Sequence, residues 1–110
     1  MSEPATTPRP PYFAVIFTST RTEVDEGYEA TAARMAELGS RQPGFLGLES
    51  ARDADGLGVT VSYWRTLEDV ARWKAVAEHL AAQRLGREKW YRAYTLRVAK
   101  VEDDWSFSRP

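Results

Sequence analysis

The order of strand-forming and helix-forming segments constrains the fold of this chain more than any other feature. Four runs rich in β-branched and aromatic residues are typical of strands, at residues 12–18, 45–53, 57–65 and 91–101. Residues 54–56 read Ala-Asp-Gly, and an Asp-Gly pair favours a tight hairpin turn. We therefore predict four strands, of which the second and third pair antiparallel.

Two helices are predicted between these strands. Thr22 with Asp25, and Thr66 with Asp69, have the spacing of a capping box, in which each side chain bonds a free N–H at a helix start. The first helix would carry an apolar stripe at three- and four-residue steps, made of Val24, Tyr28, Ala32, Met35 and Leu38. The second would run from residue 67 to about 85, where Gly86 ends it.

Strand, helix, hairpin, helix, strand is the ferredoxin-like β-α-β-β-α-β order of an α+β domain. Its helices cover one face of an antiparallel four-stranded sheet. In residues 12–17, YFAVIF, both alternating sets of side chains are mainly apolar, so the uncovered face needs a partner. We therefore expect a homodimer built by sheet-to-sheet pairing, with a disordered or extended segment at 1–11, the domain at 12–103 and a tail at 104–110.

Composition excludes several function classes. The 15 basic residues are balanced by 16 acidic ones, and no basic run is typical of nucleic-acid binding. The absence of cysteine removes disulfides and thiolate metal sites, fits a reducing compartment, and with a single histidine argues against a protein-only metal site. No apolar run has the length of a membrane span, so we expect a cytoplasmic protein without membrane or nucleic-acid partners.

The segment SYWRTLEDVARWKAVAEHLAAQRLGREKWY, residues 62–91, resembles the antibiotic biosynthesis monooxygenase (ABM) domain family. It shares a strand ending in Tyr-Trp, a Trp-Lys helix, and Glu-His ahead of Trp-Tyr. The resemblance covers roughly residues 12–103 and implies a dimeric α/β barrel with an apolar pocket between each sheet and its helices. The resemblance also implies a hydrophobic aromatic ligand. The family includes cofactor-independent monooxygenases, so the resemblance implies that this chain could oxidise a phenolic or polyketide-like substrate with O2.

A phenol oxygenase needs a base and groups that stabilise the phenolate. His79 is the only histidine, so it is the candidate base, and Arg97 and Gln83 are candidates to stabilise the oxyanion. Strand alternation places Arg97 on a face that would line the barrel. A buried arginine needs an anionic partner, and Glu49 in the second strand is either that partner or an exposed edge charge. The candidate substrate-binding aromatics are Trp64, Trp73, Tyr63, Trp90, Tyr91 and Tyr94.

Two alternatives stay open at this point. The first is a haem-binding protein with His79 as axial ligand, since Trp73 resembles a tryptophan of the haem-degrading relatives. Their ligand histidine would fall at Gln83, however, and their first-strand asparagine has no counterpart in this chain. The second alternative is a ligand-binding or dimerisation module without catalysis, in which the aromatic residues fill the pocket themselves. The resemblance implies no metal and no required cofactor.

Overall fold

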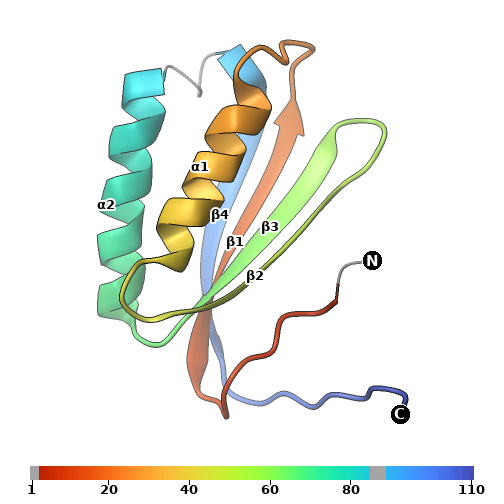
Figure 1. Cartoon of the computed structure of the whole chain (residues 1–110), viewed down its shortest axis with the longest axis vertical. Helices are drawn as coiled ribbons and strands as arrows, with labels where there is room; N and C mark the ends of the chain where they lie inside the picture. Colours follow the sequence, from red (N-terminus) through yellow and green to blue (C-terminus); the bar gives the residue numbers. More distant parts are fainter. Residues whose placement is uncertain (1–2, 85–88) are drawn as a thin grey trace.

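The computed structural model describes residues 3–84 and 89–110, and within residues 79–84 it describes the backbone only. The predicted order is confirmed (Figure 1): the elements are β1 Tyr12–Arg21, α1 Tyr28–Ser40, β2 Phe45–Arg52, β3 Leu57–Trp64, α2 Leu67–Arg84 and β4 Tyr91–Val101. The chain therefore has the α+β ferredoxin-like fold. No helix in the described ranges is long and apolar enough to cross a membrane.

The four strands form one antiparallel sheet in the order β2-β3-β1-β4. Val15 of β1 lies opposite Ser62 of β3 and Val98 of β4, so these three side chains share a face. Both helices lie side by side against that same face (Figure 1). The opposite face has no helix over it among the described elements, as the sequence predicted.

The two predicted helix starts had different outcomes. At α2 the Thr66 half of the capping box is present: Asp69 N–H donates to Thr66 Oγ1 at 3.1 Å, and the Thr66 hydroxyl donates to Asp69 Oδ2 at 2.9 Å. At α1 the prediction was wrong, because Asp25 pairs with Arg21 at 3.0 Å instead of capping a helix. The helix starts after Gly27, whose φ of 79° favours glycine, and β1 continues to Arg21.

The terminal segments cover the part of the helix-free face around Tyr12, at the start of β1. Residues 3–11 form no helix or strand, and there the Ala5 N–H donates to Glu49 at 2.8 Å and the Thr7 hydroxyl to Tyr12 Oη at 2.9 Å. Tyr12 in turn donates to Asp104, which ties the C-terminal tail to the same place. These contacts account for the burial of Tyr12, which is 4% exposed although no helix lies over it.

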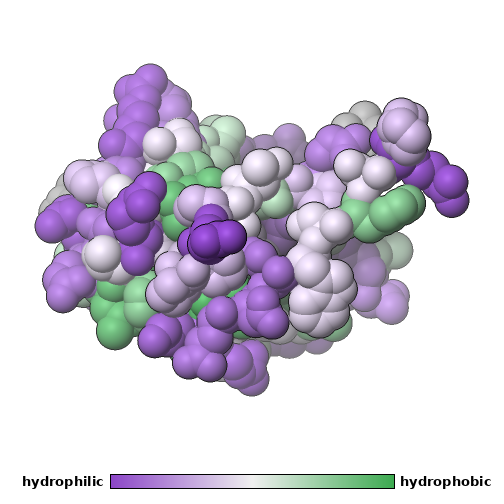
Figure 2. Space-filling view, turned by 90° about the horizontal axis from the view of Figure 1, so that it is seen from below, coloured by the Kyte–Doolittle hydropathy of each residue, from purple (hydrophilic) through white to green (hydrophobic). Residues whose placement is uncertain are grey.

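Large apolar side chains remain exposed along β4 and in the tail. On β4 they are Tyr94, Leu96 and Val98, and in the tail Trp105 and Phe107 are 89% and 83% exposed. Viewed from below, the surface is mainly hydrophilic, with hydrophobic side chains showing between polar ones (Figure 2). Solvent-exposed apolar surface therefore lies along β4 and the tail.

Candidate functional site

A cavity of about 370 Å3 lies between the helices and the sheet face that they cover. Pockets of this size accommodate small organic molecules. Its wall is mainly apolar and aromatic, and the sheet and both helices contribute to it. Its principal aromatic residues are Phe17, Tyr28, Phe45, Trp64, Trp73, Trp90, Tyr91 and Tyr94.

One end of the cavity, here called the tryptophan end, is formed by Trp64, Trp73 and Phe45. Trp64 is fully buried, stacks on Trp73 with ring centroids 5.9 Å apart, and meets the Phe45 ring edge-on at 5.5 Å. Its indole N–H donates to Ser62 Oγ at 2.8 Å, which satisfies the one polar group that burial would otherwise leave unpaired. This end is therefore rigid and apolar.

The other end, here called the tyrosine end, is formed by Tyr28, Tyr91 and Tyr94 beside Trp90. Tyr91 lies within about 6 Å of both other tyrosine rings. Trp90 is fixed by its indole N–H, which donates to the Glu26 carbonyl at 2.9 Å. Tyrosine rings supply apolar walls, while their hydroxyl groups supply hydrogen bonds. This end is therefore the more polar of the two.

The register of β1 shows how far apart the two ends lie. Trp64 is opposite Phe13 on β1, and Tyr94 is opposite Ser19. Six positions separate Phe13 from Ser19, which corresponds to about 20 Å along a strand. The cavity is therefore an elongated space with a chemically distinct group of side chains at each end.

Burial raises the pKa of Tyr91, and the neighbouring Tyr28 hydroxyl raises it further. The cations of Arg52 and Arg21 act in the opposite direction without reversing the shift. Tyr91 is therefore a protonated hydrogen-bond donor at neutral pH. Arg21 itself packs 3.3 Å from the centre of the Tyr28 ring and forms the ion pair with Asp25.

Five of the predicted substrate-binding aromatics line the cavity, namely Trp64, Trp73, Trp90, Tyr91 and Tyr94. The sixth, Tyr63, lies on the other face of the sheet, because strand alternation turns it away from its neighbour Trp64. There it donates to Glu49 at 2.6 Å. Burial and this carboxylate raise the pKa of Tyr63 to about 12.

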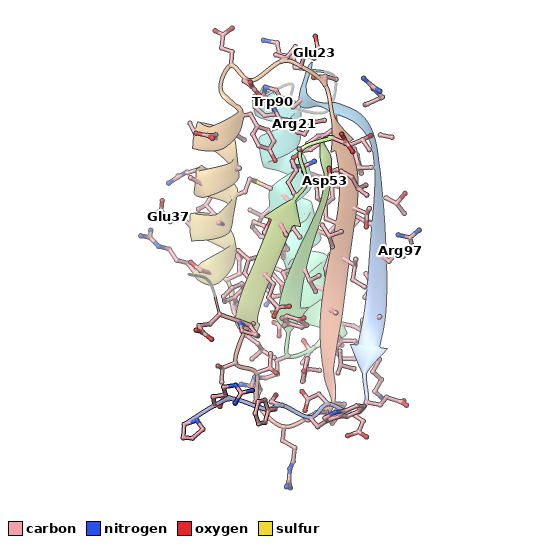
Figure 3. The ribbon with its side chains drawn as sticks, turned by 90° about the vertical axis from the view of Figure 1, so that its right-hand side faces the viewer. Arg21, Glu23, Glu37, Asp53, Trp90 and Arg97 are labelled. Carbon is pink, nitrogen blue, oxygen red and sulfur yellow. The ribbon has the colours of Figure 1, made fainter. Side chains whose placement is uncertain are left out.

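Among the described side chains, none of the predicted catalytic residues lies in the cavity. Arg97 lies opposite Ile16, on the exposed face away from the helices, and in Figure 3 it extends from the edge strand β4. The ionic pairing considered for Arg97 and Glu49 is wrong, because Glu49 is bonded to Tyr63 and Ala5 instead. The backbones of His79 and Gln83 belong to α2, and their side chains lie outside the described residues.

Sequence reasoning did not assign Arg52 to the site, although it lines the cavity near the tyrosine end. A signal was available, since the predicted hairpin turn at residues 54–56 brings Arg52 opposite Gly58. Tyr28 and Met35, which also line the cavity, were predicted only as parts of an apolar helix stripe. Among the described residues, no cluster of three or more His, Cys, Asp or Glu side chains could hold a metal ion.

Comparison with known proteins assigns the family. Residues 11–85 match the antibiotic biosynthesis monooxygenase family. The chain belongs to the ABM family. It is also 54% identical to the uncharacterized protein YqjZ of Bacillus subtilis strain 168 over 96 residues, which cover 87% of this chain and 84% of that protein. This relative extends the match beyond the family domain but carries no stated activity.

Solved ABM-fold structures share the architecture at low sequence identity. SnoaB of Streptomyces nogalater, a cofactor-independent oxygenase solved in a mutant form, superposes with a TM-score of 0.70 at 19% identity and covers 84% of this chain and 95% of its own. Rv0793 of Mycobacterium tuberculosis gives a TM-score of 0.71 at 16% identity, with 86% and 99% covered. At these identities the comparison establishes the fold.

Proposed function

We propose that this ABM-family chain binds an aromatic small molecule in the cavity and oxidises it with O2 as a cofactor-independent monooxygenase. One observation carries the proposal: a cavity of about 370 Å3 is walled by aromatic rings from both layers of the fold. A flat apolar ligand with an oxygen substituent suits a space that has tryptophans at one end and tyrosine hydroxyls at the other. The fold shared with SnoaB, which is described as a cofactor-independent oxygenase, supports the reaction class.

The reaction balances without an added reductant. With 1-naphthol, one molecule of the phenol and one of O2 give 1,4-naphthoquinone and water. The phenol loses its hydroxyl proton to a base, and the electron-rich anion passes electrons to O2. One oxygen atom is kept as the new quinone carbonyl and the other leaves as water, so the substrate supplies all the electrons.

Protein groups would stabilise the phenolate and take up its proton. Tyr91, whose raised pKa keeps it protonated, is suited to donate a hydrogen bond to the phenolate oxygen. His79 is the proposed base and Gln83 a second proposed donor, both from the sequence argument, since their side chains lie outside the described residues. The position of Arg97 on the other sheet face favours Tyr91 in its place.

We further propose that the chain works as a homodimer. Val59 on the helix-free face is 39% exposed, and Trp105 and Phe107 extend from the tail almost fully exposed. Exposed apolar side chains of this kind are stabilised by burial against a partner. A second copy is the simplest partner, because each copy would cover the sheet of the other and receive the other's tail aromatics.

The test measures binding and turnover with 1-naphthol. Binding is followed by the fluorescence of the cavity tryptophans, and turnover by oxygen consumption together with quinone absorbance in metal-free buffer. Trp73→Ala is expected to weaken binding by roughly tenfold through the lost stacking contact. His79→Ala is expected to abolish turnover while leaving binding within about threefold. Arg41→Gln, an exposed change whose partner is Glu37 on α1, serves as the control.

The outcomes separate binding from catalysis. Saturable binding without oxygen consumption would contradict the monooxygenase proposal and favour a binding module. A histidine-dependent Soret shift with hemin would favour the haem alternative instead. An absence of binding by 1-naphthol and its quinone would refute an aromatic ligand in this cavity.

A further inference from the structure

Arg52 is held in an unusual position for a residue at the end of an edge strand. It closes β2, yet its guanidinium crosses the helix-side face of the sheet over Gly58 of β3 and reaches Ser19 of β1. A Cβ on Gly58 would come within 2.5–2.8 Å of the guanidinium atoms, so only glycine leaves room for this path. The arginine therefore points along the sheet toward the tyrosine end, although the residue as a whole remains exposed.

The guanidinium is fixed by neutral oxygens. Its Nη2 donates to Ser19 Oγ at 2.7 Å, and its Nη1 donates to the Ser19 carbonyl at 3.3 Å and to the Gly56 carbonyl. Ser19 is 2% exposed, so the anchor itself is buried. These bonds orient the planar group while leaving its positive charge without a counter-ion among them. A guanidinium has five N–H donors, so these bonds leave donors available.

Arg52 differs in this respect from the other cation near Tyr91. Arg21 is neutralised by Asp25 at 3.0 Å and is covered by the Tyr28 ring. Of the described side chains that line the cavity, Arg52 carries the only positive charge and Glu78 the only negative one. The Glu78 side chain is 58% exposed and lies 4.0 Å from Lys74. A charge is thus available for a ligand at Arg52 and not at Arg21.

We propose that Arg52, together with the tyrosine end of the cavity, forms a recognition site for a carboxylate on the aromatic ligand. The guanidinium presents paired N–H donors that match the two oxygens of a carboxylate. The aromatic body of the ligand would lie along the cavity toward Trp73. The inference rests on the proposed function, since it names the ligand class of the same cavity: an aromatic acid.

Two ligands of similar shape, 2-naphthoate and the neutral 2-naphthamide, distinguish recognition of the carboxylate from binding of the aromatic body. Each is titrated into the intact protein, with intrinsic tryptophan fluorescence as the readout. The wild-type protein is expected to bind the acid at least about tenfold more tightly than the amide. This preference should decrease as salt is added, because the site is open to solvent on one side.

Three variants and a control locate the preference. Arg52→Gln should weaken acid binding by about tenfold or more and change amide binding by less than about threefold. Gly58→Ala keeps every charge but displaces the guanidinium, so it should also remove the preference. Arg52→Lys should retain part of it, since lysine keeps the charge without the planar fork. Arg41→Gln should match the wild type, and circular dichroism verifies folding in each case.

Each failure has its own meaning. Equal binding of the acid and the amide by the wild type, or an acid preference that survives both Arg52→Gln and Gly58→Ala, overturns the acid site and leaves the aromatic cavity standing. Binding of neither probe overturns the aromatic cavity, and the acid site with it. Loss of the preference in Arg52→Gln but not in Gly58→Ala would overturn the oriented geometry, because charge alone would then account for recognition.

Discussion

Replacing Trp64 tests whether the tryptophan end of the cavity also stabilises the fold. Trp64 is fully buried, contacts the rings of Phe45 and Trp73, and donates to Ser62 Oγ. Trp64→Ala should lower the free energy of unfolding by about 3–5 kcal/mol, the range for deleting a buried tryptophan. This is a large part of the ~5–15 kcal/mol by which domains are stable.

Two further variants divide this energy into its parts. Trp64→Phe keeps a ring between Phe45 and Trp73 but leaves Ser62 Oγ without its donor, so a cost of about 1–3 kcal/mol is expected. Trp73→Ala removes a partly exposed ring and should cost less than Trp64→Ala. In a double-mutant cycle, the Trp64–Trp73 pair should show a coupling of about 0.5–1.5 kcal/mol, as for other aromatic pairs.

The measurement is urea unfolding followed by far-ultraviolet circular dichroism at one fixed protomer concentration, because association adds to apparent stability. If Trp64→Ala cost less than about 1 kcal/mol, or no more than Trp73→Ala, the packing argument for this end of the cavity would fail. A cycle with no coupling would show that the stacked rings contribute independently. The Trp64→Phe variant keeps the test possible if the alanine variant does not fold.

Three other predictions concern the termini, the helix-free face and the helix cap. The pKa of Tyr63 is raised from 10.0 to about 12 in the folded state, so its contribution to stability is complete below pH 10 and is lost as the pH rises toward 12; the stability difference between wild type and Tyr63→Phe should shrink over that window. In the proposed homodimer, Trp105→Ala combined with Phe107→Ala should weaken association at least about tenfold in sedimentation velocity. Unchanged association would argue against the tail as a dimer contact. Thr66→Ala should cost about 1 kcal/mol in urea unfolding, and a neutral result would argue against a stabilising cap at Thr66.

The sequence predicted the element order because the evidence for it is local and repeated. Strand composition, the Asp-Gly turn at residues 54–56 and the Thr66 capping box each depend on neighbours within a few positions. The aromatic lining was also predictable, since Trp64 and Trp73 occupy regular positions on a buried strand and a covered helix. Features set by short-range spacing were therefore recovered from the sequence.

The errors occurred where a side chain has a different partner from the one that its spacing or charge predicted. Asp25 has the spacing of a cap, but Arg21 at the end of β1 takes its carboxylate at 3.0 Å. Glu49 has the charge to pair with Arg97, but its carboxylate instead accepts hydrogen bonds from the Tyr63 hydroxyl and the Ala5 N–H. Arg21 lies only four residues from Asp25, so in that case one local pair replaced another. The partners of Glu49 are distant in the sequence, and they depend on how the strands and the N-terminal segment pack.

The cavity wall depends on an irregularity of β2 that the alternating pattern alone could not place. Between Phe45 and Gly47 the register with β3 shifts, so Phe45 lies opposite Trp64, while Leu48 lies opposite Ser62. In a regular strand, odd- and even-numbered residues face opposite sides. The bulge reverses this phase after Phe45. It thereby allows Phe45 at the tryptophan end and Arg52 at the tyrosine end to face the same cavity, which a regular strand could not do.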